Sequence, residues 1–187
     1  MRISSILACL ACAAAASLSL QPWSATRPGP CTFEVNVASQ ESGLVQLYFD
    51  AGRGLSEQDS SIQPILAGQP RLLRFELPSG TLRALRFDPL DSYAKMTLSG
   101  ARIVGPSGAT LVAFAPGQFR PNYQIDAMRV DGDKLFVETS PGGFDPQLVI
   151  PLSAPIVIPR PFWWREILGF FTAFLGGLLL VLRVGRP

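Results

Sequence analysis

Hydrophobic and polar residues alternate in short stretches through the middle of the chain, and this pattern predicts β-strands. The stretches lie about ten residues apart and are separated by turn signals rich in Gly, Pro, Asp and Ser. The clearest of them read TFEVNVA (32–38), LVQLYFD (44–50), RLLRFEL (71–77), TLRALRF (81–87), KMTLSGARIV (95–104), ATLVAF (109–114), KLFVETS (134–140) and QLVIPL (147–152). We therefore expect an all-β domain over residues 26–158, an antiparallel β-sandwich or jelly roll of about eight strands. The segment YQIDAMRV (123–130) fits either a further strand or one short helix.

A continuous apolar run opens the chain in place of this alternation. The segment MRISSILACLACAAAASLSL carries one positive charge, Arg2, followed by apolar and small residues, as secretory signal peptides do. Small residues at Ser17 and Ser19 form only a weak cleavage site. Residues 1–25 therefore fit either a cleaved signal peptide or an uncleaved signal anchor.

A second apolar run lies near the other end of the chain. Residues 167–182 carry no charge and present no polar face, and Trp163 and Trp164 stand before them. As a helix, residues 163–182 would be about 30 Å long, which matches the hydrocarbon core of a bilayer, and tryptophans are typical of its interface. We expect a transmembrane helix here, followed by a short tail over residues 183–187.

Arginines at the outer ends of the two apolar runs predict the topology. Arg2 precedes the first run, and Arg183 and Arg186 follow the second. Because positively charged flanks tend to stay in the cytoplasm, the tail is expected to be cytoplasmic and the domain between the runs to lie outside.

Small residues recur along one face of the predicted transmembrane helix. Gly169, Ala173 and Gly177 are four residues apart, a spacing that lets two helices approach closely. They are candidate helix-packing residues, although such spacings also arise by chance in glycine-rich spans.

The composition excludes several classes of function. The chain contains no histidine, which rules out Ser-His-Asp and Cys-His catalysis and any histidine-ligated metal. The net charge of +2 comes from the ends, so the domain is near neutral and lacks the basic patch of a nucleic-acid-binding protein. Cys31 is the domain's single cysteine, because Cys9 and Cys12 fall in the first apolar run. We expect either a small buried side chain there or a disulfide to another chain.

Two short motifs add a resemblance to a known family. The stretch GLVQLYFDAGRGLSE (43–57) matches the pattern G-x-x-Q-L-Y-Y/F-D-x-G-x-G-F/L-S-E, and LRFDP (85–89) matches L-R-F/I-D-P. With these motifs, residues 33–151 resemble the extracytoplasmic β-sandwich domain of bacterial membrane proteins of surface-polysaccharide assembly. The resemblance implies a place at the bacterial inner membrane with the domain in the periplasm. Such proteins often continue into many membrane helices with glycosyltransferase-like character, whereas one helix is predicted after this domain.

Four residues of the domain are candidate ligand contacts. Tyr93 and Tyr123 lie in turn-like segments, where an exposed ring can stack on a sugar. Asp50 and Asp88 follow apolar strands, where a carboxylate can accept hydrogen bonds from hydroxyl groups. The structural alternative for both aspartates is that they bond turn amides.

The loop after Asp50 also contains Glu57 and Asp59, and three carboxylates suggest a calcium site. Calcium takes six to eight oxygen ligands, so three carboxylates are too few alone, and the spacing is not that of an EF-hand. We therefore expect no metal and no cofactor.

These features favour a membrane-anchored, non-catalytic module that binds envelope polysaccharide or takes part in its assembly. The expectation of a polysaccharide rests on the resemblance alone. Two alternatives stay open: a fragment or relative of a membrane glycosyltransferase, and a structural partner whose helix docks on a larger membrane protein or on a second copy. We expect the lipid bilayer as a partner, a glycan as a candidate ligand, no nucleic acid, and no catalytic residue.

Overall fold

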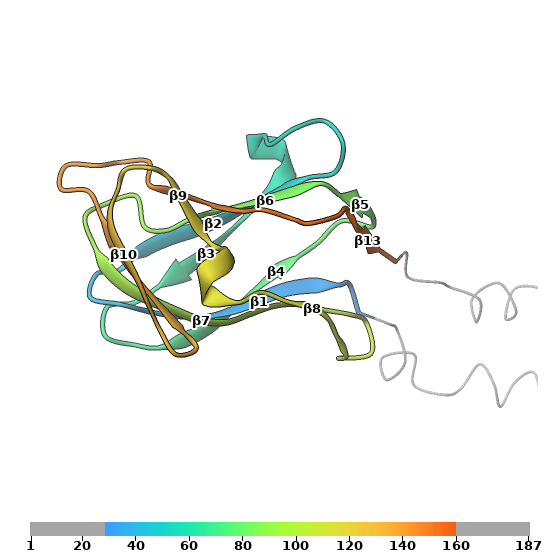
Figure 1. Ribbon diagram of the computed structural model, residues 1–187, viewed down its shortest axis with the longest axis horizontal. Coiled ribbons are helices and arrows are strands. Elements are labelled where there is room, and N and C mark those ends of the chain that lie inside the picture. Colours follow the sequence, from blue (N-terminus) through green and yellow to red (C-terminus); the bar gives the residue numbers. More distant parts are fainter. Residues whose placement is uncertain (1–28, 160–187) are drawn as a thin grey trace, which may run out of the picture. The chain divides into compact units, whose positions relative to one another are not determined.

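The computed structural model describes residues 29–159, which form a domain of β-strands (Figure 1). This part of the chain contains thirteen strands and two single turns of 3-10 helix, η2 (Glu57–Asp59) and η3 (Pro116–Gln118). The predicted all-β class with antiparallel sheets is confirmed. The segment 1–25, the predicted helix 163–182 and the tail 183–187 lie outside the described residues. Within residues 29–159 there is no helix with the length and apolarity needed to cross a membrane.

Sheet A is the larger sheet. Its strand order is β10, β11, β7, β1, β4, and β8 also pairs with β7. The strands are β1 (Thr32–Ser39), β4 (Arg71–Glu76), β7 (Lys95–Val104), β8 (Thr110–Ala113), β10 (Ile125–Asp131) and β11 (Lys134–Thr139). Phe33, Val35 and Val37 alternate into the core as the sequence pattern predicts. The residues between them face outward, and this outward face is called the outer face below.

Sheet B contains five strands in the order β3, β2, β6, β12, β9. They are β2 (Gly43–Asp50), β3 (Ser60–Ile65), β6 (Ala84–Asp88), β9 (Arg120–Tyr123) and β12 (Gln147–Ile150). Two short strands, β5 (Gly80–Leu82) and β13 (Ile156–Ile158), pair only with each other in a small third sheet.

One hydrophobic core is shared by the strands of both large sheets, which Figure 1 shows as two layers. Phe33 and Phe75 enter it from sheet A and Phe87 from sheet B, and all three are fully buried. The rings of Phe75 and Phe87 meet edge to face, with centroids 6.5 Å apart. Full burial of each such side chain contributes about 1.5–3 kcal/mol, so these contacts between sheets hold the domain together.

The segment 123–130, which fits either a strand or a short helix by its sequence, is β-strand on both sides of Gln124, whose φ is 49°. Most of it lies in β10, which pairs with β11 through a two-residue turn, Gly132-Asp133. Gly132 has a φ of 59°, a conformation that is nearly free of strain only for glycine. The turn therefore explains why the hairpin forms where the sequence reads DGD.

Three of the observed strands were not among the predicted ones. Strands β3 and β9 contain Pro64 and Pro121, and both lie at the edges of sheet B, where a missing N–H is tolerated. Strand β13 contains three residues, which is too short for an alternating pattern to reveal it. The stretch 81–87 divides at Arg83, whose N–H donates to the Asp50 carbonyl at 2.8 Å, which explains its irregular alternation.

Candidate functional site

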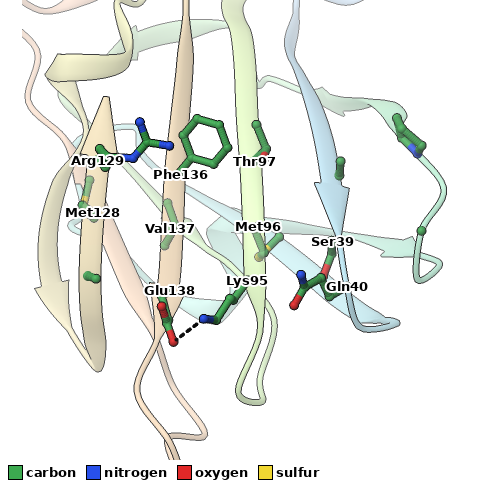
Figure 2. A pocket seen from close by; sticks show the side chains of 14 residues that line it. Ser39, Gln40, Lys95, Met96, Thr97, Met128, Arg129, Phe136, Val137 and Glu138 are labelled. Atoms are coloured by element: carbon green, nitrogen blue, oxygen red, sulfur yellow. Dashed lines mark ion pairs between the residues drawn. The ribbon is translucent and has the colours of Figure 1, made fainter. Parts of the chain in front are cut away.

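A groove of about 560 Å³ crosses the outer face of sheet A (Figure 2), a volume within the range of small-molecule sites. Its floor consists of side chains from three adjacent strands. Ala38 on β1 and Phe136 on β11 both lie opposite Thr97 of β7, so the three form one row across the sheet. We call this hollow, with its floor of Ala38, Thr97 and Phe136, the sheet A groove.

An arginine lies against one side of the aromatic ring in the groove. Arg129 on β10 lies opposite Phe136, and its guanidinium is 4.5 Å from the ring centroid. The same guanidinium donates to Asp131 at 3.0 Å. Figure 2 shows the Arg129 head beside the Phe136 ring. This cation–π contact holds a flat aromatic surface and a donor-rich group side by side at the protein surface.

One end of the groove carries a small charged cluster. Lys95 Nζ lies 3.2 Å from Glu138 Oε1, an ion pair that Figure 2 marks. The Tyr93 hydroxyl donates to the same oxygen at 2.6 Å. The hydrogen bond from Tyr93, and after it the one from Lys95, hold the pKa of Glu138 below its ordinary value. Glu138 therefore stays ionised at neutral pH and acts as a fixed acceptor.

The loop between β3 and β4 forms the wall of the groove on the side away from β10. Gly68 and Pro70 line it, and the Gly68 N–H donates to the Ser39 carbonyl at 2.8 Å. This hydrogen bond ties the wall to the end of β1. On the other side of the groove, β10 is held by its pairing with β11.

A second group of polar side chains lies on the outer face of sheet B, between β2 and the loop that follows it. The Tyr48 hydroxyl donates to Glu57 Oε1, while the Gln46 amide donates to Glu57 Oε2 and to Ser60 Oγ, both at 2.9 Å. These bonds fasten η2 back onto the sheet. Burial, and after it the bond to Glu57, raise the pKa of Tyr48 to about 12, so the phenol remains a donor.

The neighbouring strand β6 extends this assembly with an ion pair. Arg86 donates from Nε and Nη2 to the two carboxylate oxygens of Asp88 at 2.9 and 2.8 Å, and its guanidinium stacks 3.9 Å from the centroid of the Tyr48 ring. Burial raises the pKa of Asp88 to about 6 even though the Arg86 bonds act against that rise. We call Gln46, Tyr48, Glu57, Arg86 and Asp88 the sheet B network.

The two sequence motifs meet in this network. The stretch 43–57 supplies β2 and its loop, and the stretch 85–89 supplies β6, which pairs with β2. Gly43 is explained by packing, since a Cβ built there would lie 2.3 Å from Leu90 Cδ2.

The candidate ligand residue Asp50 organises the loop that follows it. Its Oδ1 accepts hydrogen bonds from the N–H groups of Gly52 at 2.7 Å and Gly54 at 2.8 Å. These bonds keep the pKa of Asp50 below its ordinary value. The geometry is that of the structural alternative, an aspartate bonding turn amides. Among residues 29–159, no group of three acidic or cysteine side chains is placed to hold a metal ion.

The four candidate ligand residues do not share one face. Asp88 belongs to the sheet B network, and Asp50 caps its loop. Tyr123 lies on the edge strand β9 of sheet B with half of its surface exposed. Tyr93 stands beside Glu138 at the sheet A groove. Their contact with a ligand stays a prediction, and of the four only Tyr93 bonds to a residue that lines the groove.

The remaining sequence candidates fall into two groups. Cys31 is buried, as in the first of its two alternatives, and burial raises the pKa of its thiol, which makes it a poor nucleophile. The helix-packing residues Gly169, Ala173 and Gly177 lie outside the described residues.

Sequence reasoning missed the floor of the groove. The available signal was Phe136, an aromatic side chain on the outward positions of a strand whose inward positions are Leu135 and Val137. No local signal pairs it with Thr97, because that contact depends on which strands become neighbours.

No protein-family model matches the chain, and neither a curated protein nor a solved structure matches it.

Proposed function

We propose that residues 29–159 are a β-sandwich module that binds an extended glycan in the sheet A groove without reacting with it. The observation that carries this proposal is the groove floor, where an aromatic ring, a hydroxyl and a methyl group lie in one row between charged side chains. The resemblance of the two sequence motifs to polysaccharide-assembly proteins supports the choice of a glycan.

The groove suits the surface of a sugar. A pyranose presents an apolar face and a rim of hydroxyl groups. The Phe136 ring supplies an apolar partner for the face, while Glu138 accepts and Lys95 donates hydrogen bonds at the rim. The groove is shallow, so we expect a Kd of roughly 0.1–1 mM, or about −4 to −5.5 kcal/mol.

The number and the pKa of carboxyl groups in the groove favour binding without catalysis. Glycoside hydrolysis uses a pair of carboxyl groups, one with a raised pKa. Glu138 is the one acidic residue among the described groove residues, and its pKa is lowered by Tyr93 and Lys95. Such a group is unsuited to act as a general acid at neutral pH.

The proposal includes anchoring at a bacterial inner membrane, and the placement of the chain ends supports attachment of the domain through both of them. The first and last described residues lie at the same end of the domain, on the right in Figure 1. Strand β1 leads away from that end, so Ser39 and the groove lie farther from it than Thr32 does. A domain held by both ends would therefore keep its groove accessible.

Binding can be tested with the full-length chain in detergent micelles, applied to an array of bacterial envelope glycans. Phe136→Ala should abolish any signal, because it removes the stacking surface. Phe144→Ala is the matched control, since Phe144 is 75% exposed on a loop outside the groove. Absence of binding to every glycan would overturn the proposal and favour a docking role in assembly. Equal loss in both variants would also overturn it.

Topology can be tested with reporters. A reporter after Pro187 should be cytoplasmic and one inserted at Gly54 periplasmic. Gly54 suits an insertion because it is exposed and has open space around it. A periplasmic reporter after Pro187 would contradict the anchoring scheme.

A further inference from the structure

A row of three charged side chains crosses the outer face of sheet A beyond the groove. Glu34 on β1 lies directly opposite Arg74 of β4 and opposite Arg102 of β7. Arg74 Nε donates to Glu34 Oε1 at 2.9 Å, and Arg102 donates to Oε2 from Nε at 3.1 Å and from Nη2 at 2.8 Å. We call Arg74, Glu34 and Arg102 the arginine row.

A β-bulge places the second arginine in this row. Asn36 pairs with Ser99, but Glu34 pairs with Arg102, so an advance of two residues on β1 corresponds to three on β7. The extra residue is accommodated at Gly100, which has a φ of 62°. With regular alternation Arg102 would point into the core. The bulge re-aims it to the outer face.

The row retains binding capacity after its internal bonds are made. Glu34 is buried with only 8% of its side chain exposed, whereas the side chains of Arg74 and Arg102 are 64% and 46% exposed. One carboxylate neutralises one of two arginines, which leaves one net positive charge. In the described part of the chain, the Nη groups of Arg74 and Nη1 of Arg102 have no partner, and the nearby Glu76 forms no ion pair with Arg74.

The arginine row and the sheet A groove lie on the same face. Ala38 in the groove floor and Glu34 are four residues apart on β1, which is about 13 Å along a strand. Asn36 and Ser99 lie between them, opposite each other, and offer polar side chains on the way. An oligosaccharide of several rings would reach from one to the other.

We infer that the glycan bound by this face is acidic, and that the arginine row takes an oxyanion carried on one of its sugars, a carboxylate or a phosphate. This inference rests on the proposed function of the groove. Two guanidinium groups fixed by one buried carboxylate are pre-organised for such an anion, because they can donate several charge-assisted hydrogen bonds without first being ordered.

The test compares an oligouronate with its carboxyl-reduced, neutral counterpart by calorimetric titration of the full-length chain in detergent micelles. The acidic form should bind about tenfold tighter, as expected for charge-assisted hydrogen bonds at an exposed site. In the triple variant Glu34→Gln/Arg74→Gln/Arg102→Gln this preference should vanish while the affinity for the neutral saccharide stays unchanged. The triple variant avoids leaving Glu34 buried without a partner.

Arg120→Gln is the matched control, because it makes the same change in net charge on sheet B and should keep the preference. Equal affinity of the wild type for the two saccharides, or a preference that survives in the triple variant, would overturn the inference while leaving the groove proposal standing. Failure of both saccharides to bind would overturn the groove proposal itself. A phosphorylated oligosaccharide that binds more tightly than the oligouronate, and loses this in the triple variant, would identify phosphate as the oxyanion.

Discussion

The outer faces of the two sheets use their polar side chains in opposite ways. On sheet B, Tyr48, Glu57, Arg86 and Asp88 bond to one another, and η2 is fastened to the sheet by these bonds. On sheet A, the groove exposes an aromatic ring, and the arginine row on the same face keeps exposed donors without a partner among the described residues. A network closed on itself stabilises the fold, whereas a face with unused donors is suited to recognition.

The sequence motifs suggest that the functional face is on sheet B, whereas the unused donors lie on sheet A. The conspicuous motifs, residues 43–57 and 85–89, fold into the closed network of sheet B. The residues of the groove floor, Ala38, Thr97 and Phe136, belong to no motif. Substitutions on sheet B should therefore alter stability with little effect on binding, and those on sheet A should do the reverse.

The largest effect is expected for Arg86→Met. It leaves the buried carboxylate of Asp88 without its partner and removes the stack on Tyr48, so the free energy of unfolding should fall by about 3–5 kcal/mol at neutral pH. Urea unfolding followed by circular dichroism measures this loss. The double variant Arg86→Met/Asp88→Asn, which removes the unpaired charge, should recover much of it. A double variant as unstable as the single one would show that the charge is not the cause.

The same pair predicts a dependence on pH. The folded-state pKa of Asp88, about 6, lies above 3.8, the ordinary pKa of an aspartate and the one expected in the unfolded chain. The folded state therefore binds the proton more tightly, and the contribution of Asp88 to stability decreases as pH rises between these two values. Without Arg86 the pKa should rise further, so the loss in Arg86→Met should be larger at about pH 7.5 than at about pH 5. A loss that is the same at both would contradict the ionisation argument.

A smaller loss is expected for Gly100→Ala on sheet A. An alanine at a φ of 62° is strained, and its Cβ would lie 3.2 Å from Asn36 Nδ2. We expect the free energy of unfolding to fall by about 1–2 kcal/mol. Because the bulge aims Arg102, the preference for an acidic glycan should weaken as well.

Gly132→Ala is the control for Gly100→Ala, since it carries similar strain in a turn at φ 59° with open space around it. It should lower stability without changing the preference for acidic over neutral saccharide. If Gly100→Ala leaves the preference for acidic saccharide intact, the bulge does not contribute to binding.

Tyr48→Phe should reduce stability by about 1 kcal/mol, the typical net contribution of one hydrogen bond. It removes the hydroxyl that donates to Glu57 but keeps the ring under Arg86. Thermal unfolding is the measurement. Tyr93→Phe is the matched control, because it removes an exposed hydroxyl that donates to Glu138, and its melting temperature should not change. Equal effects would mean that the sheet B network is no more stabilising than a surface bond.

A small effect on stability is expected for Phe136→Ala, about 1 kcal/mol or less, because the ring is only half-buried and faces away from the core. Glycan binding should nevertheless be lost, whereas Tyr48→Phe should lower stability and leave binding unchanged. A chain that unfolds readily after Phe136→Ala would assign the ring to the fold rather than to a ligand.

The sequence predicted where the strands lie better than it predicted which strands pair. The alternation around Phe33, Val35 and Val37 located β1 and its buried side correctly. The edge strands with Pro64 and Pro121 were missed because proline interrupts the local pattern. Asp50 and Asp88 were noticed as carboxylates after strands, but nothing local showed that one caps glycine amides and the other pairs with Arg86.

By itself, the sequence determined the all-β class and the inward and outward sides of its main strands, because the alternation of side chains along a strand is a local property. Only the tertiary structure decided which outward residues became neighbours. Ala38, Thr97 and Phe136 meet because β1, β7 and β11 pair in one register, and Arg102 reaches Glu34 because a bulge at Gly100 shifts that register. Strand pairing joins residues far apart in the chain, and a shift of one position moves a side chain to the other face of the sheet.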